Sequence, residues 1–173
     1  MNKCNIDLLN QHFIIMENKI TFQFISEPTD VNFGGKVHGG AVMKWIDQTA
    51  FACASSWAEG YCVTIYAGGI RFYKPILIGN LVKVVAKVIY TGKTSIHIAV
   101  DVYSRKISEF EFNKTTHCVI VFVSVDEAGK PKPVNSWTPM TEKDKHMEHY
   151  AKKLMQLRKD IEVEMQPFLK EYL

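Results

Sequence analysis

The sequence predicts an α+β fold in which one antiparallel sheet wraps around a single helix. A strand-like segment precedes a long apolar helical segment, and four further strand-like segments follow it with short turns between them. Sequential strands with short connections form antiparallel sheets. With 173 residues, one domain is expected. We divide the chain into a folded body, residues 1–130, and an appendage, residues 131–173, made of a linker and a helix.

The body begins with one strand, one loop and one helix. Residues 19–27 alternate loosely between apolar and polar, and Pro28 ends this strand. Turn-forming residues fill positions 29–40, which predicts a loop. Residues 41–57 contain no glycine or proline and read as a helix. Apolar residues occupy most of its circumference, so we expect a helix that is covered on most sides.

The rest of the body is predicted to form a meander of strands. Strand-like stretches cover residues 62–73, 82–91, 95–106 and 116–125, with turn residues between them. A period of two is the signature of a strand. It is carried by three sets of residues: Val82, Val84, Ala86 and Val88; Ile96, Ile98, Val100 and Val102; Val119, Val121, Val123 and Val125.

A linker with prolines at both ends, Pro131 to Pro139, leads to a second helix over residues 141–166, which Pro167 is expected to stop. Its apolar residues recur every three or four positions with charges between them, namely Met147, Tyr150, Leu154, Leu157 and Ile161. This pattern predicts an amphipathic helix. It lies either on its own sheet or against a neighbouring subunit.

Composition excludes several classes of protein. The net charge is +3, and no basic arm points to a nucleic-acid partner. No apolar stretch approaches the roughly 18 to 20 residues of a membrane span. The polar first residues lack the pattern of a secretion signal, so we expect a cytoplasmic protein. The four cysteines are scattered without a CxxC pair, and neither a metal site nor a cofactor is expected.

Asp47 is the unusual residue of the first helix. It stands among Trp45, Ile46, Ala50 and Phe51 and is too far along the helix to cap its start. A carboxylate in apolar surroundings costs several kcal/mol unless it is partnered, and such groups cluster at active sites. The alternative is that Asp47 lies on one wet face of the helix, beside its polar neighbours Lys44 and Gln48.

The loop before the helix supplies further candidates. Gly39 and Gly40 at the helix start leave backbone N–H groups open to a ligand that carries negative charge. Asn32 offers an amide for a water or a carbonyl, or else it stabilises a turn. Gly40 and Asp47 are seven residues apart, roughly 10 Å along a helix axis. One helix therefore cannot easily bring both to one carbon, so we predict an obligate dimer with antiparallel helices and two composite sites.

An ordered set of short motifs resembles the hotdog-fold acyl-CoA thioesterases. The resemblance runs from about residue 20 to 127 and is carried by Asp30-Val31-Asn32, Gly35, His38-Gly39-Gly40-Ala41-Val42-Met43, Ile46-Asp47, Ile70-Arg71-Phe72-Tyr73-Lys74-Pro75, Gly79-Asn80 and Thr91-Gly92-Lys93-Thr94-Ser95. It implies a hotdog fold. It also implies that Asp47 is the general base or nucleophile, that Asn32 orients the water or thioester, and that the Gly40 N–H polarises the thioester carbonyl.

The resemblance implies hydrolysis of acyl-CoA to a free acid and CoA, a step of lipid metabolism. His38, Gly39, Arg71, Lys93, Thr94 and Ser95 are the expected substrate-binding residues. His38 looks like the aryl-CoA branch, of the phenylacetyl-CoA type, whereas residues 69–95 look like the broad acyl-CoA branch. The alternative to an enzyme is a non-catalytic acyl-CoA-binding or sensor protein on the same fold. A homo-oligomer is expected, built from the dimer, with a trimer of dimers as one larger form.

Overall fold

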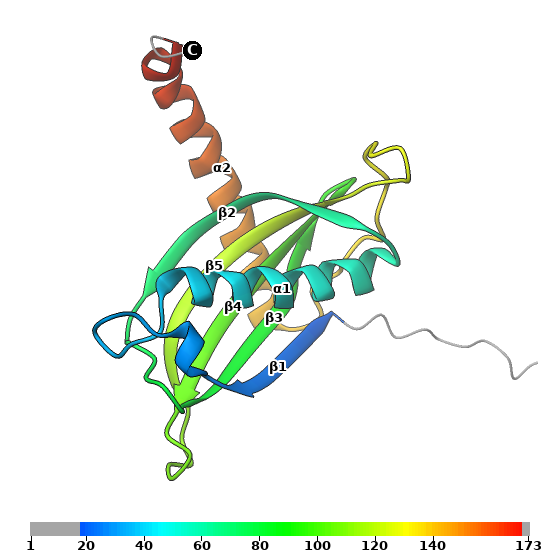
Figure 1. Cartoon of the computed structure of the whole chain (residues 1–173). Helices are drawn as coiled ribbons and strands as arrows, with labels where there is room; N and C mark the ends of the chain where they lie inside the picture. The colour runs from blue at the N-terminus through cyan, green and yellow to red at the C-terminus, as the bar shows by residue number, and fades with distance from the viewer. Residues whose placement is uncertain (1–17, 171–173) are drawn as a thin grey trace, which may run out of the picture.

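The computed structural model describes residues 18–170, and within them one sheet of five antiparallel strands curves around helix α1 (Gly39–Ala58) (Figure 1). The strands are β1 (Lys19–Ile25), β2 (Cys62–Phe72), β3 (Leu81–Thr91), β4 (Ser95–Arg105) and β5 (Asn113–Ser124). Their order across the sheet is β1-β3-β4-β5-β2, so β1 and β2 are the edges. The short 3-10 helix η1 (Pro28–Asp30) precedes α1, and α2 (Glu142–Lys170) follows the sheet. The predicted α+β architecture is confirmed.

Helix α1 buries one side against the concave face of the sheet. Its buried residues include Trp45, Ile46 and Ala50, and Phe24 of β1 packs edge-on against the Trp45 ring with 4.8 Å between centroids. The opposite side of α1 is exposed, including Met43 and Phe51, at 46% and 37%. The expectation of a helix covered on most sides is therefore wrong for the single chain, because the sheet curves around only one side of it.

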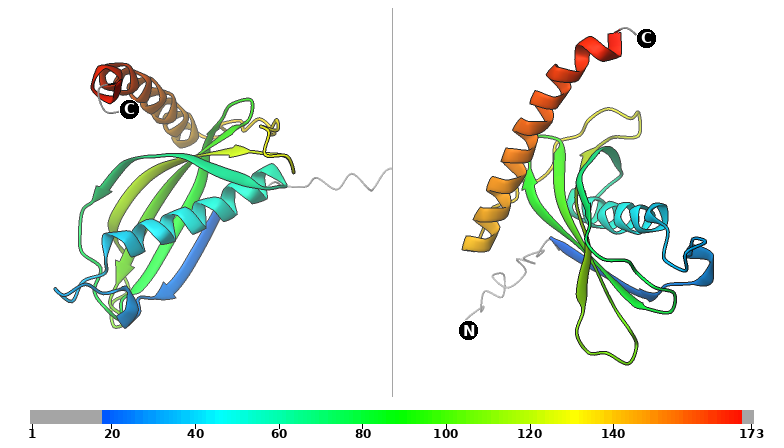
Figure 2. Two further views of the ribbon diagram at one scale, coloured as in Figure 1. Left: turned by 45° about the horizontal axis from the view of Figure 1, so that its top comes forward. Right: turned by 90° about the vertical axis from the view of Figure 1, so that its left-hand side faces the viewer.

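Strands β4 and β5 are buried on both faces, which a simple two-period pattern does not predict. Ile98, Val100 and Phe122 face α1, while Ala99 and Val119 belong to a second, smaller cluster that includes residues of α2. The sheet is thus the middle of three layers, with α1 on one face and α2 on the other (Figure 2). Cys53, Cys62 and Cys118 are buried, and Cys4 lies outside the described residues.

The second helix starts at a capping box and continues further than predicted. The Thr141 hydroxyl accepts a hydrogen bond from the Asp144 N–H, and the Asp144 carboxylate accepts one from the Thr141 N–H, both at 3.1 Å. Pro167 lies inside α2 and does not stop it at residue 166. Proline destabilises the helix little here, because Val163, whose carbonyl it leaves unbonded, is an exposed residue close to the helix end. Neither helix within residues 18–170 is long and apolar enough to span a membrane.

Asp144 also fastens the start of α2 to the sheet, because its carboxylate accepts a 2.6 Å hydrogen bond from Lys87 of β3. This bond, more than any other contact, lowers the pKa of Asp144 to about 2, although burial alone would raise it. A carboxyl whose pKa is lower in the folded state than in the unfolded one stabilises the fold above its unfolded pKa. That stabilisation is lost as the pH falls from about 4 towards 2.

We expect Asp144→Asn to lower the free energy of unfolding at pH 7 by about 1–2 kcal/mol, because both the cap and the ion pair are weakened. Urea unfolding at fixed protein concentration measures the difference, which should shrink as the pH approaches 2. Asp160→Asn is the matched control, since Asp160 is an exposed residue of the same helix. If the difference in the free energy of unfolding between the wild type and Asp144→Asn stayed constant from pH 7 to pH 2.5, the stabilising role of the Asp144 carboxylate would be contradicted.

Candidate active site

The start of α1 presents backbone N–H groups that the helix itself does not use. The first four N–H groups of a helix have no intrahelical acceptor. Here the N-cap residue His38 makes no side-chain capping bond, and Gly40 is exposed. A Cβ added at Gly40 would meet nothing within 4 Å. A ligand oxygen can therefore approach this N–H closely, in a region of partial positive charge.

Asn32 holds the loop that leads into the helix. Its Oδ1 accepts hydrogen bonds from the N–H groups of Gly34, at 2.9 Å, and Lys36, at 3.3 Å. The turn-stabilising interpretation of Asn32 is therefore correct for its oxygen. These two bonds fix the orientation of the amide, and its Nδ2 group makes no hydrogen bond within residues 18–170. Nδ2 remains a donor for a carbonyl or a water.

A cavity of about 220 Å³ opens beside the helix start. Its lining is mostly apolar and comes from the loop, α1, the end of β2 with the segment after it, and β5: Val37, Gly39, Val42, Phe72, Tyr73, Lys74, Pro75, Ile76 and Thr116. The Phe72 ring comes so close to Gly39 that a Cβ there would lie 3.7 Å from it. Of the substrate-binding candidates, Gly39 therefore lines this cavity, whereas His38 and Arg71 are exposed and are not part of its lining.

Asp47 lies on the open side of α1, with Lys44 and Gln48 exposed beside it. In the single chain its surroundings are those of a wet helix face, and the expectation of an apolar setting is wrong there. Its Oδ1 accepts a 2.9 Å hydrogen bond from the hydroxyl of Thr64 on β2. This bond holds the carboxylate in one orientation on the face that α1 and β2 share.

Thr64 was not identified from the sequence. Threonine is common in strands, and no local motif marks it. Its place beside Asp47 follows from the packing of α1 on β2, which brings together residues 17 positions apart. Irregular pairing between β2 and β5 at Thr64/Tyr66 also interrupts the simple alternation of side chains along this strand.

Lys93, Thr94 and Ser95 lie at the other end of α1. Lys93 and Thr94 lie in the turn between β3 and β4, and Ser95 is the first residue of β4. The Lys93 carbonyl accepts a hydrogen bond from the N–H of Val134. The next residue, Asn135, accepts a hydrogen bond from Trp57 in the last turn of α1. Within one chain, these three residues are therefore separated from Gly40 by the length of the helix.

A helix embraced by an antiparallel sheet, with an open glycine-containing start and a carboxylate in its middle, defines the hotdog class of fold. Residues 34–111 match the thioesterase superfamily. A protein of Buchnera aphidicola subsp. Baizongia pistaciae, described as an uncharacterized acyl-CoA thioester hydrolase, is 34% identical over 67% of this chain and 88% of its own length.

Solved structures agree. One described as an apo-hexameric acyl-CoA thioesterase has a TM-score of 0.79 at 31% identity and covers 83% of this chain and 92% of its own. The acyl-CoA hydrolase of Staphylococcus aureus, solved with butyryl coenzyme A, has a TM-score of 0.82 at 27% identity, covering 89% and 94%. This chain belongs to the thioesterase superfamily and has its hotdog fold.

Variants of the Staphylococcus aureus protein have also been solved. In three of them an asparagine, an aspartate or a threonine is replaced by alanine, and their TM-scores against this chain are 0.83, 0.82 and 0.82. Those three positions are separated by 15 and then 17 residues. The same spacings separate Asn32, Asp47 and Thr64 in this chain.

Proposed function

We propose that this protein is an acyl-CoA thioesterase, which hydrolyses an acyl-CoA to a free acid and CoA. The observation that carries the proposal is the carboxylate of Asp47, oriented by Thr64 on the open face of α1 in a chain that belongs to the thioesterase superfamily. We place the activity in the lipid metabolism of the cytoplasm, where acyl-CoA is made and used.

In the proposed reaction Asp47 acts on the thioester carbon in one of two ways. As a general base, it takes a proton from a water, whose oxygen then bonds to the acyl carbon. As a nucleophile, its carboxylate oxygen forms a mixed anhydride with the acyl group, which water then opens. In both routes the carbon–sulfur bond breaks, and the thiolate of CoA leaves and takes up a proton.

Two further groups serve the thioester oxygen and the water. The N–H of Gly40 donates a hydrogen bond to the carbonyl oxygen, which gains negative charge in the transition state. The Nδ2 group of Asn32 donates to the water or the carbonyl, and its orientation is set by the loop bonds of its Oδ1. Both donors are N–H groups that are in place before the substrate binds, so neither role needs a charged side chain.

The proposed site needs two subunits. Gly40 and Asp47 are roughly 10 Å apart along α1, too far to act on one carbon. The open face of α1 adjoins β2, an edge strand of 11 residues that leaves one row of backbone groups unpaired. We propose that β2 pairs with β2 of a second copy, which sets the two α1 helices antiparallel and covers the exposed Met43 and Phe51. The start of one helix then approaches Asp47 of the other.

The same arrangement unites the proposed CoA-binding residues. Lys93, Thr94 and Ser95 are near the end of α1, and His38, Gly39 and Arg71 are near its start. Antiparallel helices place the end of one on the same side of the dimer as the start of the other. A hexamer, as in the related acyl-CoA thioesterase, would then be a trimer of such dimers.

Release of free thiol from a panel of acyl-CoAs tests the proposed function. The panel runs from acetyl-CoA to palmitoyl-CoA and includes phenylacetyl-CoA, which examines the aryl-CoA branch suggested by His38. We expect thiol release that saturates with at least one member. Saturable binding of acyl-CoA without thiol release would reject the enzyme and favour a sensor. The absence of both binding and release would reject the site altogether.

A further inference from the structure

One apolar stripe runs along α2 from its start to its end, but only the first half of it is covered. Met147, Tyr150, Ala151 and Leu154 pack on the outer face of the sheet, around Ile89 and Val119. The same side of the helix continues as Leu157, Ile161, Met165 and Phe168, spaced by three or four residues, which we call the distal stripe. These four side chains are 47%, 55%, 49% and 69% exposed.

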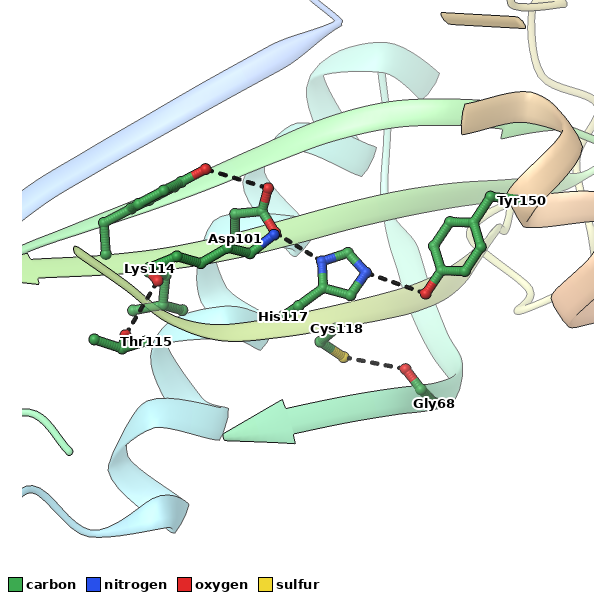
Figure 3. A network of polar contacts seen from close by, with 9 residues as sticks. Gly68, Asp101, Lys114, Thr115, His117, Cys118 and Tyr150 are labelled. Carbon is green, nitrogen blue, oxygen red and sulfur yellow. Dashed lines mark hydrogen bonds and ion pairs between the residues drawn. The ribbon is translucent and has the colours of Figure 1, made fainter. Parts of the chain in front are cut away.

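The covered half of α2 fixes the direction of the helix. Figure 3 shows Tyr150 reaching from α2 to His117 of β5, whose Nε2 lies 3.1 Å from the tyrosine oxygen. The other ring nitrogen, Nδ1, lies 2.7 Å from Asp101 of β4. Burial would raise the pKa of Asp101, but hydrogen bonds from His117 and Lys114 outweigh it, so the pKa is lowered and the carboxylate stays charged.

Beyond this anchor, α2 crosses the edge of the sheet. Arg158 lies over the ring of Tyr66 on β2, with 4.7 Å between the guanidinium carbon and the ring centroid. Residues 159–170 are all exposed, and the helix projects past β2 into open space (Figures 1 and 2). A helical segment of this length is marginal in water without tertiary contacts. The distal stripe therefore requires a cover that residues 18–170 of the same chain do not provide.

We propose that the distal stripe packs on a second copy of this chain, the subunit that joins at β2. The proposal rests on the dimer of the proposed function. In that dimer the sheet continues past β2, on the side towards which α2 projects. The distal stripe thus reaches the outer side of the partner subunit, where it meets the distal stripe of the partner's α2.

The sequence of α2 is self-complementary in this arrangement. When two such helices run antiparallel about an axis near Ile161, residues equally far from position 161 face each other. Leu157 then faces the partner's Met165, so that apolar meets apolar. Arg158 faces the partner's Glu164, so that a cation meets an anion.

Each subunit has a pocket that the last residue of the partner's distal stripe, Phe168, would approach. A pocket of about 240 Å³ opens where α2 crosses the sheet edge, lined by Ile65, Ser95, His97, Val121, Met155, Arg158, Lys159 and Glu162. Burial lowers the pKa of His97 to about 4, so the histidine is neutral at pH 7. In the antiparallel arrangement Phe168 comes level with position 154 of the partner, next to Met155, which lines the partner's pocket.

A pair of charged substitutions tests the proposal against a matched control. The stripe variant is Ile161→Asp with Phe168→Asp. The control is Val163→Asp, because Val163 is 69% exposed on the opposite side of the same helix. We expect sedimentation velocity over a range of concentrations to show a subunit dissociation constant raised at least about 100-fold in the stripe variant. The control should assemble as the wild type does. Equal assembly of both variants would overturn the proposal.

A photo-crosslinker identifies what covers the stripe. p-Benzoylphenylalanine at position 161 of the purified protein should join two subunits on illumination, and at position 163 it should not. Crosslinking only within one chain would overturn the proposal. The proposal would also be overturned if the wild type bound phosphatidylglycerol vesicles and the stripe variant lost this binding while it still assembled. The occupant of the stripe would then be a lipid surface.

These outcomes are separate from those of the proposed function. Thiol release is measured on the same wild-type and variant preparations. A wild type that assembles through the stripe but releases no thiol contradicts the enzyme and not the interface. A wild type that releases thiol while the stripe and control variants assemble equally contradicts only the interface.

Discussion

Replacement of Asp47 by asparagine is expected to lower the turnover of acyl-CoA by about 10² to 10⁴-fold. The change is nearly isosteric, and the amide oxygen can still accept the hydrogen bond that Thr64 donates to Asp47 at 2.9 Å. Only the ability to take a proton or to attack as an anion is removed. Because Asp47 is exposed in the single chain, we expect little change in the stability of the subunit.

Steady-state thiol release with the best substrate of the panel measures this effect, and the loss should fall on kcat. Gln48→Ala is the matched control, because Gln48 is the exposed neighbour of Asp47 on the same face of α1. Circular dichroism verifies that both variants are folded. Near-normal turnover by Asp47→Asn would remove Asp47 from the mechanism. An equal loss of turnover in Gln48→Ala would indicate that any change on this face of α1 damages the site.

The second prediction concerns the sharing of one site by two subunits. Gly40→Pro removes the N–H proposed to polarise the thioester carbonyl, and the first turn of a helix tolerates proline. Loss of one such donor is expected to lower kcat by about 10² to 10³-fold. When Gly40→Pro and Asp47→Asn chains are coexpressed, a mixed dimer has one site with both defects and one site with neither. Activity should therefore return to about a quarter of the wild-type value for random pairing.

The control for this experiment is Gly40→Ala, which keeps the N–H and adds a Cβ where the structure has open space. We expect Gly40→Ala to retain most of the activity. Each inactive variant alone should stay inactive at every concentration. If both groups served the same site from one chain, every mixed dimer would carry one defect in each site, and the mixture would stay inactive.

Much of the fold was predictable because it rests on local patterns. The period of two in residues such as Val82, Val84 and Ile98 fixes the strands, and the predicted strand bounds agree with the structure within three residues. A helix was expected for the same kind of reason, although it begins at Gly39 and not at residue 41 as predicted. The predicted stop at Pro167 was wrong, because the effect of a proline on a helix depends on whether the freed carbonyl is exposed to water.

The candidate site was predictable only in part. Asn32, Gly40 and Asp47 stood out through residue type and spacing, and the loop bonds of Asn32 show how its amide is oriented. Thr64 carried no signal of its own, because its role depends on which strand lies beside α1. The exposure of Asp47 could not be predicted from the sequence either, because apolar neighbours along a helix do not show which side of it the sheet covers.

The sequence by itself determined the order of strands and helices, the glycine-containing helix start and the presence of one acid in the middle of the helix, because these depend on residues close together in the chain. The tertiary structure alone decided that the sheet covers one side of α1, that β2 is an edge, and that α2 crosses this edge with half of its apolar stripe exposed. These features depend on long-range packing, in which the burial of each surface is set by elements far away in the sequence.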